Sequence, residues 1–384
     1  MKIGKYLAAG VAVAIAGAAL TGCSDGSTSD DSSATATSTL SAAAQAALET
    51  AYTGQGSTLS DLPSVDVPSG ITLGIMSCGQ SQPGCSGPAA AMQDAADELG
   101  WDSEIADGKL TPDGFAAAIR QLVADGVDAI IPIGIPCQAA QAAFQEAKDA
   151  GIVIVGGGGT DGCDPQIWDS ARLWVDGLTD DDQFAVIGQL QADYAYGVND
   201  GDVEAITLTS TGAGWGQTIT DGFTDELTTL GSGEVVEDIQ VSGTEESDSS
   251  FVAKVTSALV AHPEVNTLVV PVSAWLTANG LAAAIVQAGR TDITVVARGG
   301  EEAVLDLIEQ GDSGVTATIG YSSDWGAWGS VDTVARILAG DDPQEIGDWV
   351  QAIDADNNLP DSGDYTGPAD VDWKTAFLTA WGVE

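Results

Sequence analysis

Basic residues are scarce in this sequence. It has 11 Lys and Arg against 57 Asp and Glu, which gives a formal net charge of −46. So acidic a chain repels phosphate backbones and anionic headgroups, which excludes nucleic acid and anionic lipid surfaces as partners. The acidity has two interpretations. The protein either attracts cations or, as we favour, carries a solvating acidic surface suited to a salty medium.

The sequence also lacks the short motifs of common catalytic and cofactor sites. It contains no Walker A loop and no G-x-S-x-G nucleophile elbow. Residues 157–162 match the G-x-G-x-x-G pattern by letter, but Pro165 follows where the phosphate-binding helix should open. Residues 354–358 resemble the start of a calcium loop, but Leu359 and Tyr365 stand where such a loop needs Gly and Glu. We therefore expect no enzymatic activity, no cofactor and no metal.

No apolar run reaches the roughly 20 residues that a membrane-spanning helix needs. Lys2 and Lys5 precede a shorter apolar segment over 7–20, and the tetrapeptide Leu-Thr-Gly-Cys then ends at Cys23. This pattern resembles a bacterial lipobox, which predicts a signal peptide over 1–22 and a lipid on the Cys23 sulfur. The alternative is an ordinary secretory signal with an incidental cysteine. We expect an extracytoplasmic protein that is lipid-anchored to the cell membrane.

The regions that flank the globular body are polar. Residues 24–60 are Ser, Thr, Ala, Gly and Asp with little to bury, so we assign 23–69 to the lipidated cysteine and a flexible tether, in which only 40–52 could form a short helix. The body from 71 to about 353 is long enough for two lobes. Residues 356–384 are expected to be a C-terminal extension draped on a lobe.

Residues 126–155 carry the clearest structural pattern. An apolar run over 128–133, a helical pattern over 138–149 ended by Gly151, and a β-branched run over 152–155 spell out a strand, a helix and a strand. Such a unit places its two strands in parallel. Because ligands bind at the carboxyl ends of parallel strands, the loops after Ile133 and Val155 are the expected site.

Four cysteines remain besides Cys23, an even number in an exported protein. Cys78 and Cys85 both lie in the loop after the first strand, whereas Cys137 and Cys163 follow two strands that the β-α-β unit makes neighbours. We therefore predict disulfides that join 78 to 85 and 137 to 163. A zinc site is the competing interpretation, and the absence of a C-x-x-C pair disfavours it.

The alternation of strands and helices continues along the body. Strands are predicted at 71–76, 203–208, 235–241, 268–270 and 293–297, and helices at 87–99, 111–126, 184–198, 218–230, 251–261 and 281–288. At this point the chain resembles the type I periplasmic binding proteins of the ribose-binding kind. The segments that carry the resemblance are GVDAIIPI, AKDAGIVIV, GQTITDGFTDEL, AHPEVNTLVV, LAAAIVQAGRTDITVVARGG and AVLDLIEQGDSGVTATIGYSSDWGAWGSVDTVARILAGD.

The resemblance implies an α/β fold of two similar lobes, each a parallel sheet sandwiched by helices, joined by a three-segment hinge. The first lobe would comprise 70–176 plus 299–342, and the second 177–298 plus 343–355. The crossings would fall near 176, 298–300 and 340–344. The single histidine, His262, stands where the family has a similar His-Pro before a strand, so we expect a loop or capping role.

At the binding positions that the resemblance implies, the sequence departs from sugar-binding relatives. Gly158 and Gly159 replace a common Asp-Arg pair, 272–275 replaces an Asn-Asp pair, and Tyr321 replaces a frequent Gln. The pocket thus keeps aromatic rings and loses acids. Its expected lining is Ser77, Gln80, Pro136, Thr160, Asp161, Thr211, Trp215, Trp275, Arg298, Tyr321 and Trp325.

Three of these residues have a competing structural interpretation. Trp215 and Trp275 follow strand ends, so each could contact a ligand, but core packing is the commoner fate of tryptophan. Arg298 could clamp a carboxylate or vicinal hydroxyls with its planar fork, or it could pair with a nearby acid.

The resemblance implies a monomeric solute-binding subunit of an ABC importer. It would bind a sugar or sugar derivative and deliver it to permease and ATPase partners, with no chemistry of its own. One alternative is a binding protein for an organic or aromatic acid, which the missing acids and Arg298 favour. The other is a ligand sensor for a membrane receptor.

Overall fold

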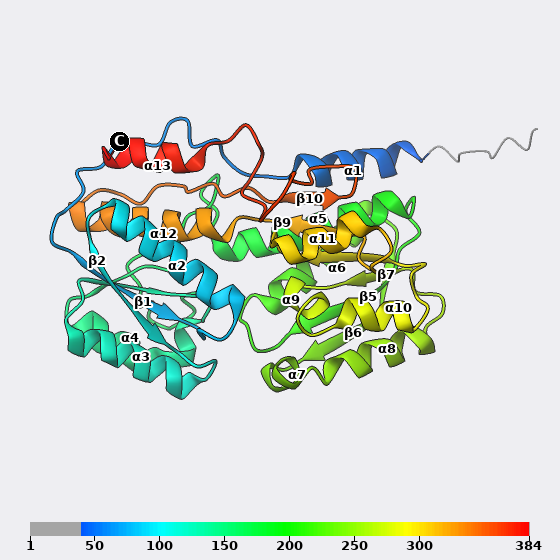
Figure 1. Cartoon of the computed structure of the whole chain (residues 1–384), viewed down its shortest axis with the longest axis horizontal. Helices are drawn as coiled ribbons and strands as arrows, with labels where there is room; N and C mark the ends of the chain where they lie inside the picture. Colours follow the sequence, from blue (N-terminus) through cyan, green and yellow to red (C-terminus); the bar gives the residue numbers. More distant parts are fainter. Residues whose placement is uncertain (1–39, 384) are drawn as a thin grey trace, which may run out of the picture. The chain divides into compact units, whose positions relative to one another are not determined.

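The computed structural model describes residues 40–383. The expected signal peptide and the expected lipidation site Cys23 lie outside the described residues. Between 40 and 383, no helix combines the length and the apolar character needed to cross a bilayer. This part of the chain folds into two α/β lobes, each built on its own sheet (Figure 1).

The first lobe contains a four-stranded sheet. Its strands are β1 (Thr72–Ser77), β2 (Asp102–Asp107), β3 (Ala129–Pro132) and β4 (Val153–Ile154). They run parallel in the order β2-β1-β3-β4. The helices between them are α2 (Pro83–Glu98), α3 (Pro112–Asp125), the 3-10 turn η1 (Cys137–Ala140) and α4 (Gln141–Asp149). The predicted β-α-β unit over 126–155 is therefore confirmed.

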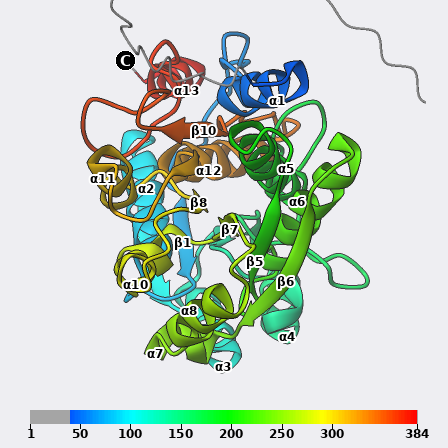
Figure 2. The same cartoon turned by 90° about the vertical axis from the view of Figure 1, so that its right-hand side faces the viewer.

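The second lobe contains a six-stranded sheet. Its strands are β5 (Glu204–Ser210), β6 (Glu234–Val241), β7 (Thr267–Val269), β8 (Thr294–Arg298), β9 (Ala317–Gly320) and β10 (Gln351–Asp354). The order is β10-β9-β8-β7-β5-β6, and only β10 is antiparallel. The helices are α5 (Asp180–Val198), α6 (Gly216–Leu230), α7 (Gly243–Asp248), α8 (Phe251–Ala261), α9 (Ser273–Leu276), α10 (Leu281–Gln287) and α11 (Glu302–Gln310). In Figure 2, α5 and α6 lie on one side of this sheet and α10 and α11 on the other.

Each sheet is buried on both faces, which confirms the expected class of fold. In the first lobe, one apolar cluster packs under α2 and a second packs under α3 and α4. In the second lobe, one cluster packs under α8, α10 and α11, and another under α5 and α6. Apolar runs such as Ile130–Ile131 suit strands that are covered on both faces.

The structure corrects the expected division into lobes. The sequence places 299–342 in the first lobe, but α11 and β9 lie in the second, where β9 pairs with β8. Burial explains this, because α11 presents Val304, Leu305 and Ile308 to the second-lobe core. Only α12 (Ser323–Ala339) returns to the first lobe. The second and third crossings therefore fall near 321–322 and 346–350 rather than at 298–300 and 340–344.

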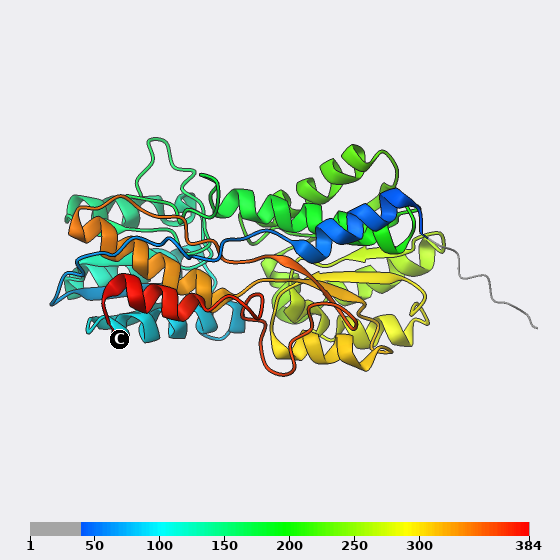
Figure 3. The ribbon, with the colours of Figure 1, turned by 90° about the horizontal axis from the view of Figure 1, so that it is seen from above.

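The expected tether is folded from residue 40 onward. Helix α1 (Ala42–Thr53) packs along α5 (Figure 3), with Ala44, Ala47 and Ala51 buried. Farther on, Gln55 bridges to Val350, and the Val65 amide donates to the Ala380 carbonyl at 2.9 Å. Alanine methyls give little apolar signal in a sequence. They nevertheless allow two helices to approach closely, which is why this segment can dock.

The C-terminal extension contacts both lobes rather than one. Tyr365 is buried in the second-lobe core, and its amide donates to the Gly300 carbonyl at 2.6 Å. Helix α13 (Trp373–Trp381) then packs on α12 of the first lobe (Figure 3). Trp373, Phe377 and Trp381 surround Trp328 of α12. Both ends of the described chain thus hold the two lobes together.

Candidate functional site

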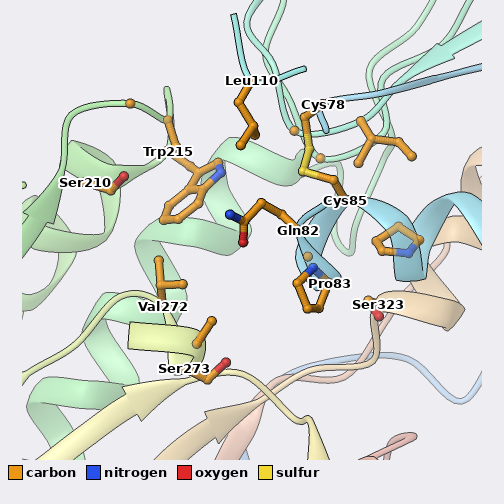
Figure 4. Close-up of a pocket in the computed structure, with 18 of the residues that line it drawn as sticks. Cys78, Gln82, Pro83, Cys85, Leu110, Ser210, Trp215, Val272, Ser273 and Ser323 are labelled. Carbon is orange, nitrogen blue, oxygen red and sulfur yellow. A yellow bond between two sulfur atoms is a disulfide. The ribbon is translucent and has the colours of Figure 1, made fainter. Parts of the chain in front are cut away.

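A cavity of about 1100 Å³ lies between the carboxyl ends of the two sheets. Loops that follow strands of both lobes line it, together with the first turns of α2 and α5. In Figure 4, Trp215 of the second lobe and Gln82 of the first face the same space, and the Cys78–Cys85 disulfide lies at its edge. This is the edge of the sheets at which parallel α/β folds bind ligands.

Three of the eleven predicted lining residues line the cavity, namely Trp215, Arg298 and Tyr321. Ser77 lies just beneath the wall. It is fully buried, and its hydroxyl donates to the carbonyl of Cys85, which does line the cavity.

Two predicted tryptophans are core residues instead. Trp275 is fully buried in α9 and packs on Phe251, with ring centroids 4.9 Å apart. Trp325 is also fully buried. Its indole N–H donates to the Ile346 carbonyl at 2.6 Å, and its ring stacks on Trp373. Both residues sit on the helix that follows a strand, and each faces the core side of that helix. A position after a strand end therefore did not suffice to predict contact with the cavity.

The other predicted residues lie outside the lining. Gln80 and Thr211 are exposed loop residues. Asp161 accepts hydrogen bonds from the backbone N–H groups of Ile167 and Trp168, both at 2.8 Å, and so shapes its own loop.

Pro136 and Thr160 mark a point where the lobes approach each other. A Cβ built on Gly214 of the second lobe would lie 3.6 Å from the Pro136 Cβ and 3.9 Å from the Thr160 hydroxyl. These two residues of the first lobe therefore sit at a contact between the lobes rather than in the cavity wall.

Arg298 lies inside a box of aromatic rings. Its guanidinium carbon is 4.6 Å from the Trp215 ring centre, 4.5 Å from that of Tyr321 and 5.2 Å from that of Phe184. Phe184 and Trp215 are themselves stacked, with centroids 5.6 Å apart. The rings satisfy the faces of the guanidinium through cation–π attraction. They do not satisfy its N–H donors, which point outward in the guanidinium plane.

The donors of Arg298 have few acceptors. One terminal N–H donates to the Pro271 carbonyl at a long 3.4 Å, and the Nε–H is buried with no hydrogen-bond partner. Between residues 40 and 383, no carboxylate lies within ion-pair distance of this side chain. The competing prediction of an ion pair with a nearby acid is therefore wrong.

Four acids of the lining were not predicted from the sequence, namely Glu246, Asp248, Glu301 and Asp348. Asp348 is 1% exposed, and its Oδ1 atom has no hydrogen-bond partner. Glu301 accepts a hydrogen bond from the Ser273 hydroxyl at 2.7 Å. Asp348 comes from the third crossing, where no strand pattern marks a binding position. Glu301 lies three residues beyond β8, a signal that could have identified it. The cavity therefore contains acids as well as rings.

A buried charge cluster stands at the hinge. Asp180, the first residue of α5, accepts from the Arg172 Nε at 2.6 Å and from the Gly158 amide at 3.2 Å. Burial raises the pKa of Asp180 to about 6 even beside Arg172, and burial also raises the pKa of Asp348. Since Arg172 and Gly158 belong to the first lobe and Asp180 to the second, this cluster ties the lobes together.

Both predicted disulfides are present, and they join Cys78 to Cys85 and Cys137 to Cys163. The Asp161 carboxylate lies close to the second pair, but both sulfurs there are bonded to each other and are not available to a metal. The first pair braces the loop after β1, whose Cys78 carbonyl accepts from the Leu110 amide at 2.8 Å.

The loop after β2 has an unusual backbone. Lys109 and Leu110 have φ values of 52° and 56°, in the left-handed region that non-glycine residues seldom occupy. Both residues line the cavity from the first lobe. Consecutive residues in this conformation carry backbone strain, which is typical of functional sites.

Comparisons with known proteins agree with this architecture. Residues 73–342 match the family model described as a periplasmic binding protein domain. A search of curated proteins finds no match to the chain. Among solved structures, the arabinose ABC transporter binding protein of Shewanella sp. ANA-3, bound to L-arabinofuranose, shares 20% identity at a TM-score of 0.63, over 74% of this chain and 92% of that one.

Two further structures give similar values. The 5-methylthioribose transporter binding protein of Thermotoga lettingae shares 19% identity at a TM-score of 0.64, over 83% of this chain and 95% of that one. The myo-inositol binding protein of Caulobacter shares 14% identity at a TM-score of 0.63, over 74% of this chain and 94% of that one. At these identities the likeness establishes the fold.

Proposed function

Because the chain belongs to the periplasmic binding protein domain family, we propose that it is the extracytoplasmic solute-binding subunit of an ABC importer. It binds a sugar or sugar derivative in the cavity and delivers it, as a monomer, to a membrane permease. The observation that carries the proposal is the cavity between the two sheets, which combines an aromatic wall with the unpartnered Oδ1 atom of Asp348. The three solved structures named above were solved for binding proteins of an arabinose transporter, a methylthioribose transporter and myo-inositol.

The lining chemistry supports a hydroxyl-rich ligand. A buried carboxylate oxygen without a donor is costly, and a ligand hydroxyl supplies the missing hydrogen bond. Trp215 offers an apolar face of the kind that stacks beneath a sugar ring. Since both lobes contribute lining residues, a bound ligand contacts both at once. Its binding free energy then favours the closed state, which is the shape that a permease recognises.

We expect a binding ligand to protect the fold, and Trp215→Ala to remove that protection. Ligand at a hundred times its dissociation constant stabilises the folded state by about 2.7 kcal/mol, a rise in Tm of about 3–5 °C for a protein of this size. Thermal melts against a panel of sugars and sugar acids measure this rise. Trp349→Ala is the matched control, because Trp349 is a partly buried tryptophan outside the cavity lining.

Both tryptophan variants should melt below the wild type, but only Trp215→Ala should lose the ligand-dependent rise. A panel in which no compound raises the Tm of the wild-type protein contradicts the proposed class of ligand. Equal ligand-dependent rises in wild type and Trp215→Ala contradict the assignment of the aromatic wall.

The location is part of the same proposal. The Leu-Thr-Gly-Cys motif that ends at Cys23 supports a lipid anchor. Cys23→Ala removes the sulfur that carries the lipid, so the protein should move from the membrane fraction to the soluble or uncleaved pool. Stable membrane binding needs several acyl chains, because a single chain binds the bilayer only marginally. Detergent phase partitioning measures the change. Unaltered partitioning of the variant would argue for an ordinary secretory signal.

A further inference from the structure

The distribution of basic side chains points to the charge of the ligand. The described residues contain nine Lys and Arg, and six of them pair with a carboxylate. The three others are Lys109, Arg298 and Lys374. Lys374 lies over the rings of Trp328 and Trp373 and outside the cavity lining. The remaining two both line the cavity, Lys109 from the first lobe and Arg298 from the second.

In a protein with a net charge of −46, bases without a carboxylate partner need an explanation. Acids are abundant enough to pair with every base, and six of the nine bases do form an ion pair. Arg298 instead sits among three rings, with its Nε–H buried and unpartnered. The fork of an arginine matches a carboxylate in its own plane. A carboxylate on the ligand would complete the hydrogen bonding that the protein leaves open.

Two helix ends add to the positive potential. The first turn of α2 in the first lobe and residue Trp215 before α6 in the second line the cavity, and neither helix start has a capping side chain. The helices are 16 and 15 residues long. The N-termini of such helices favour anionic ligand groups through the helix dipole. These two helix ends add to the positive potential of Arg298, which is the main group expected to bind the anion.

The acids of the lining disfavour a doubly charged anion more than a singly charged one. Glu301 is already hydrogen-bonded by Ser273, and Asp348 stands beside the Arg172–Asp180 pair. Glu246 and Asp248 line the cavity from α7. These four carboxyl groups repel a doubly charged phosphate more than a singly charged carboxylate. They also supply acceptors for ligand hydroxyls.

We propose that the cavity binds a sugar acid, a polyhydroxylated ligand whose one carboxylate docks on the Arg298 fork while its hydroxyls face Asp348 and Glu301. Lys109, on the opposite lobe, adds an exposed charge near the same carboxylate when the lobes close. This inference rests on the proposed function, since it specifies the ligand of the same cavity.

The test uses ligand pairs that differ in one group. D-glucose is compared with D-glucuronate, and D-galactose with D-galacturonate, by isothermal titration calorimetry on the full folded protein. We expect each acid to bind at least tenfold more tightly than its neutral partner. Glucose 6-phosphate and gluconate complete the panel, and they separate a phosphate from a carboxylate and a ring from an open chain.

Variants then locate the effect. Arg298→Gln should weaken acid binding about 10- to 100-fold and leave neutral sugars within about threefold. Arg298→Lys should fall between, because it keeps the charge and loses the fork. Lys109→Gln should weaken binding of the sugar acids only a few-fold. Arg120→Gln is the matched control, since it removes the same charge from an exposed ion pair outside the cavity lining.

The outcomes separate this inference from the proposed function. If neutral sugars bind and their acids do not, the sugar-acid assignment is wrong and the proposed function stands. If no member of the panel binds, both are wrong. If glucose 6-phosphate binds more tightly than the sugar acids, the assignment of a carboxylate as the anionic group of the ligand is wrong. Acid binding that Arg298→Gln leaves within twofold overturns the role of Arg298. The comparison of wild-type ligand pairs decides the ligand class even if that variant does not fold.

Discussion

Replacing Arg336 by Met is expected to lower the free energy of unfolding by about 3–5 kcal/mol, because it leaves a buried carboxylate without its partner. Arg336 and Asp332 are 1% and 0% exposed, and two hydrogen bonds of 2.7 and 3.1 Å join them. Arg336 also donates to the Pro63 carbonyl at 2.8 Å, and the Trp381 indole donates to Asp332 at 2.8 Å. One ion pair therefore links α12 to both terminal segments.

Urea unfolding of wild type and variant measures this loss. Arg120→Met is the control, because its pair with Glu146 is about half exposed, at 47% and 50%, and solvent screening leaves such a pair little effect on stability. Combining Arg336→Met with Asp332→Leu should recover much of the stability, since the stranded charge is gone. If Arg336→Met is as stable as Arg120→Met, the buried ion pair contributes little to the free energy of unfolding.

Asp193→Asn is expected to stabilise the protein at pH 8 and to leave its stability nearly unchanged at pH 4. Asp193 is 6% exposed in α5, and burial, followed by the charge of Glu226, raises its pKa to about 7. A folded-state pKa above the unfolded value means that the folded protein holds a proton that the unfolded chain releases. The associated stability is fully present below about pH 4 and is lost as the pH rises through about 7.

At pH 8 the loss amounts to roughly 3–4 kcal/mol, which the neutral amide avoids because it keeps the shape of a protonated carboxyl. Unfolding curves at pH 4 and pH 8 measure the difference between the variant and the wild type. Asp225→Asn, which removes an exposed charge from neighbouring α6, should change little at either pH. An Asp193→Asn gain of equal size at both values would rule out titration as its cause.

The fold was predictable where the chain repeats a strong local pattern. The apolar run at β3, the helical period of α4 and the glycine at 151 define a β-α-β unit by themselves, and the disulfide pairing follows from that unit. The lobe boundaries were not predictable in the same way. Whether α11 and β9 join the first or second lobe depends on which core buries Val304 and Ile308, and both cores are apolar.

The site was predictable only in part, because the sequence shows neither the direction of a side chain nor the contacts between residues that are far apart in the chain. Sequence position identifies a residue that follows a strand, as for Trp215 and Trp275, but not which side of the next helix its ring occupies. Trp215 faces the cavity and Trp275 faces the core. Asp348 reaches the cavity from a crossing with no periodic pattern. Phe184 and Arg298 meet through tertiary packing over more than a hundred residues of chain.

The interlocking of the chain ends has a consequence for how the protein is made. One of the two apolar clusters of the first lobe contains both Leu59 and Trp381, and one of the two in the second lobe contains both Ala47 and Ala352. Neither of these two clusters can therefore be completed by a chain that lacks either end. Contacts between residues so distant in sequence slow folding, because a long loop must close before they form. We therefore expect the chain to complete these two clusters only after nearly all of it has been made.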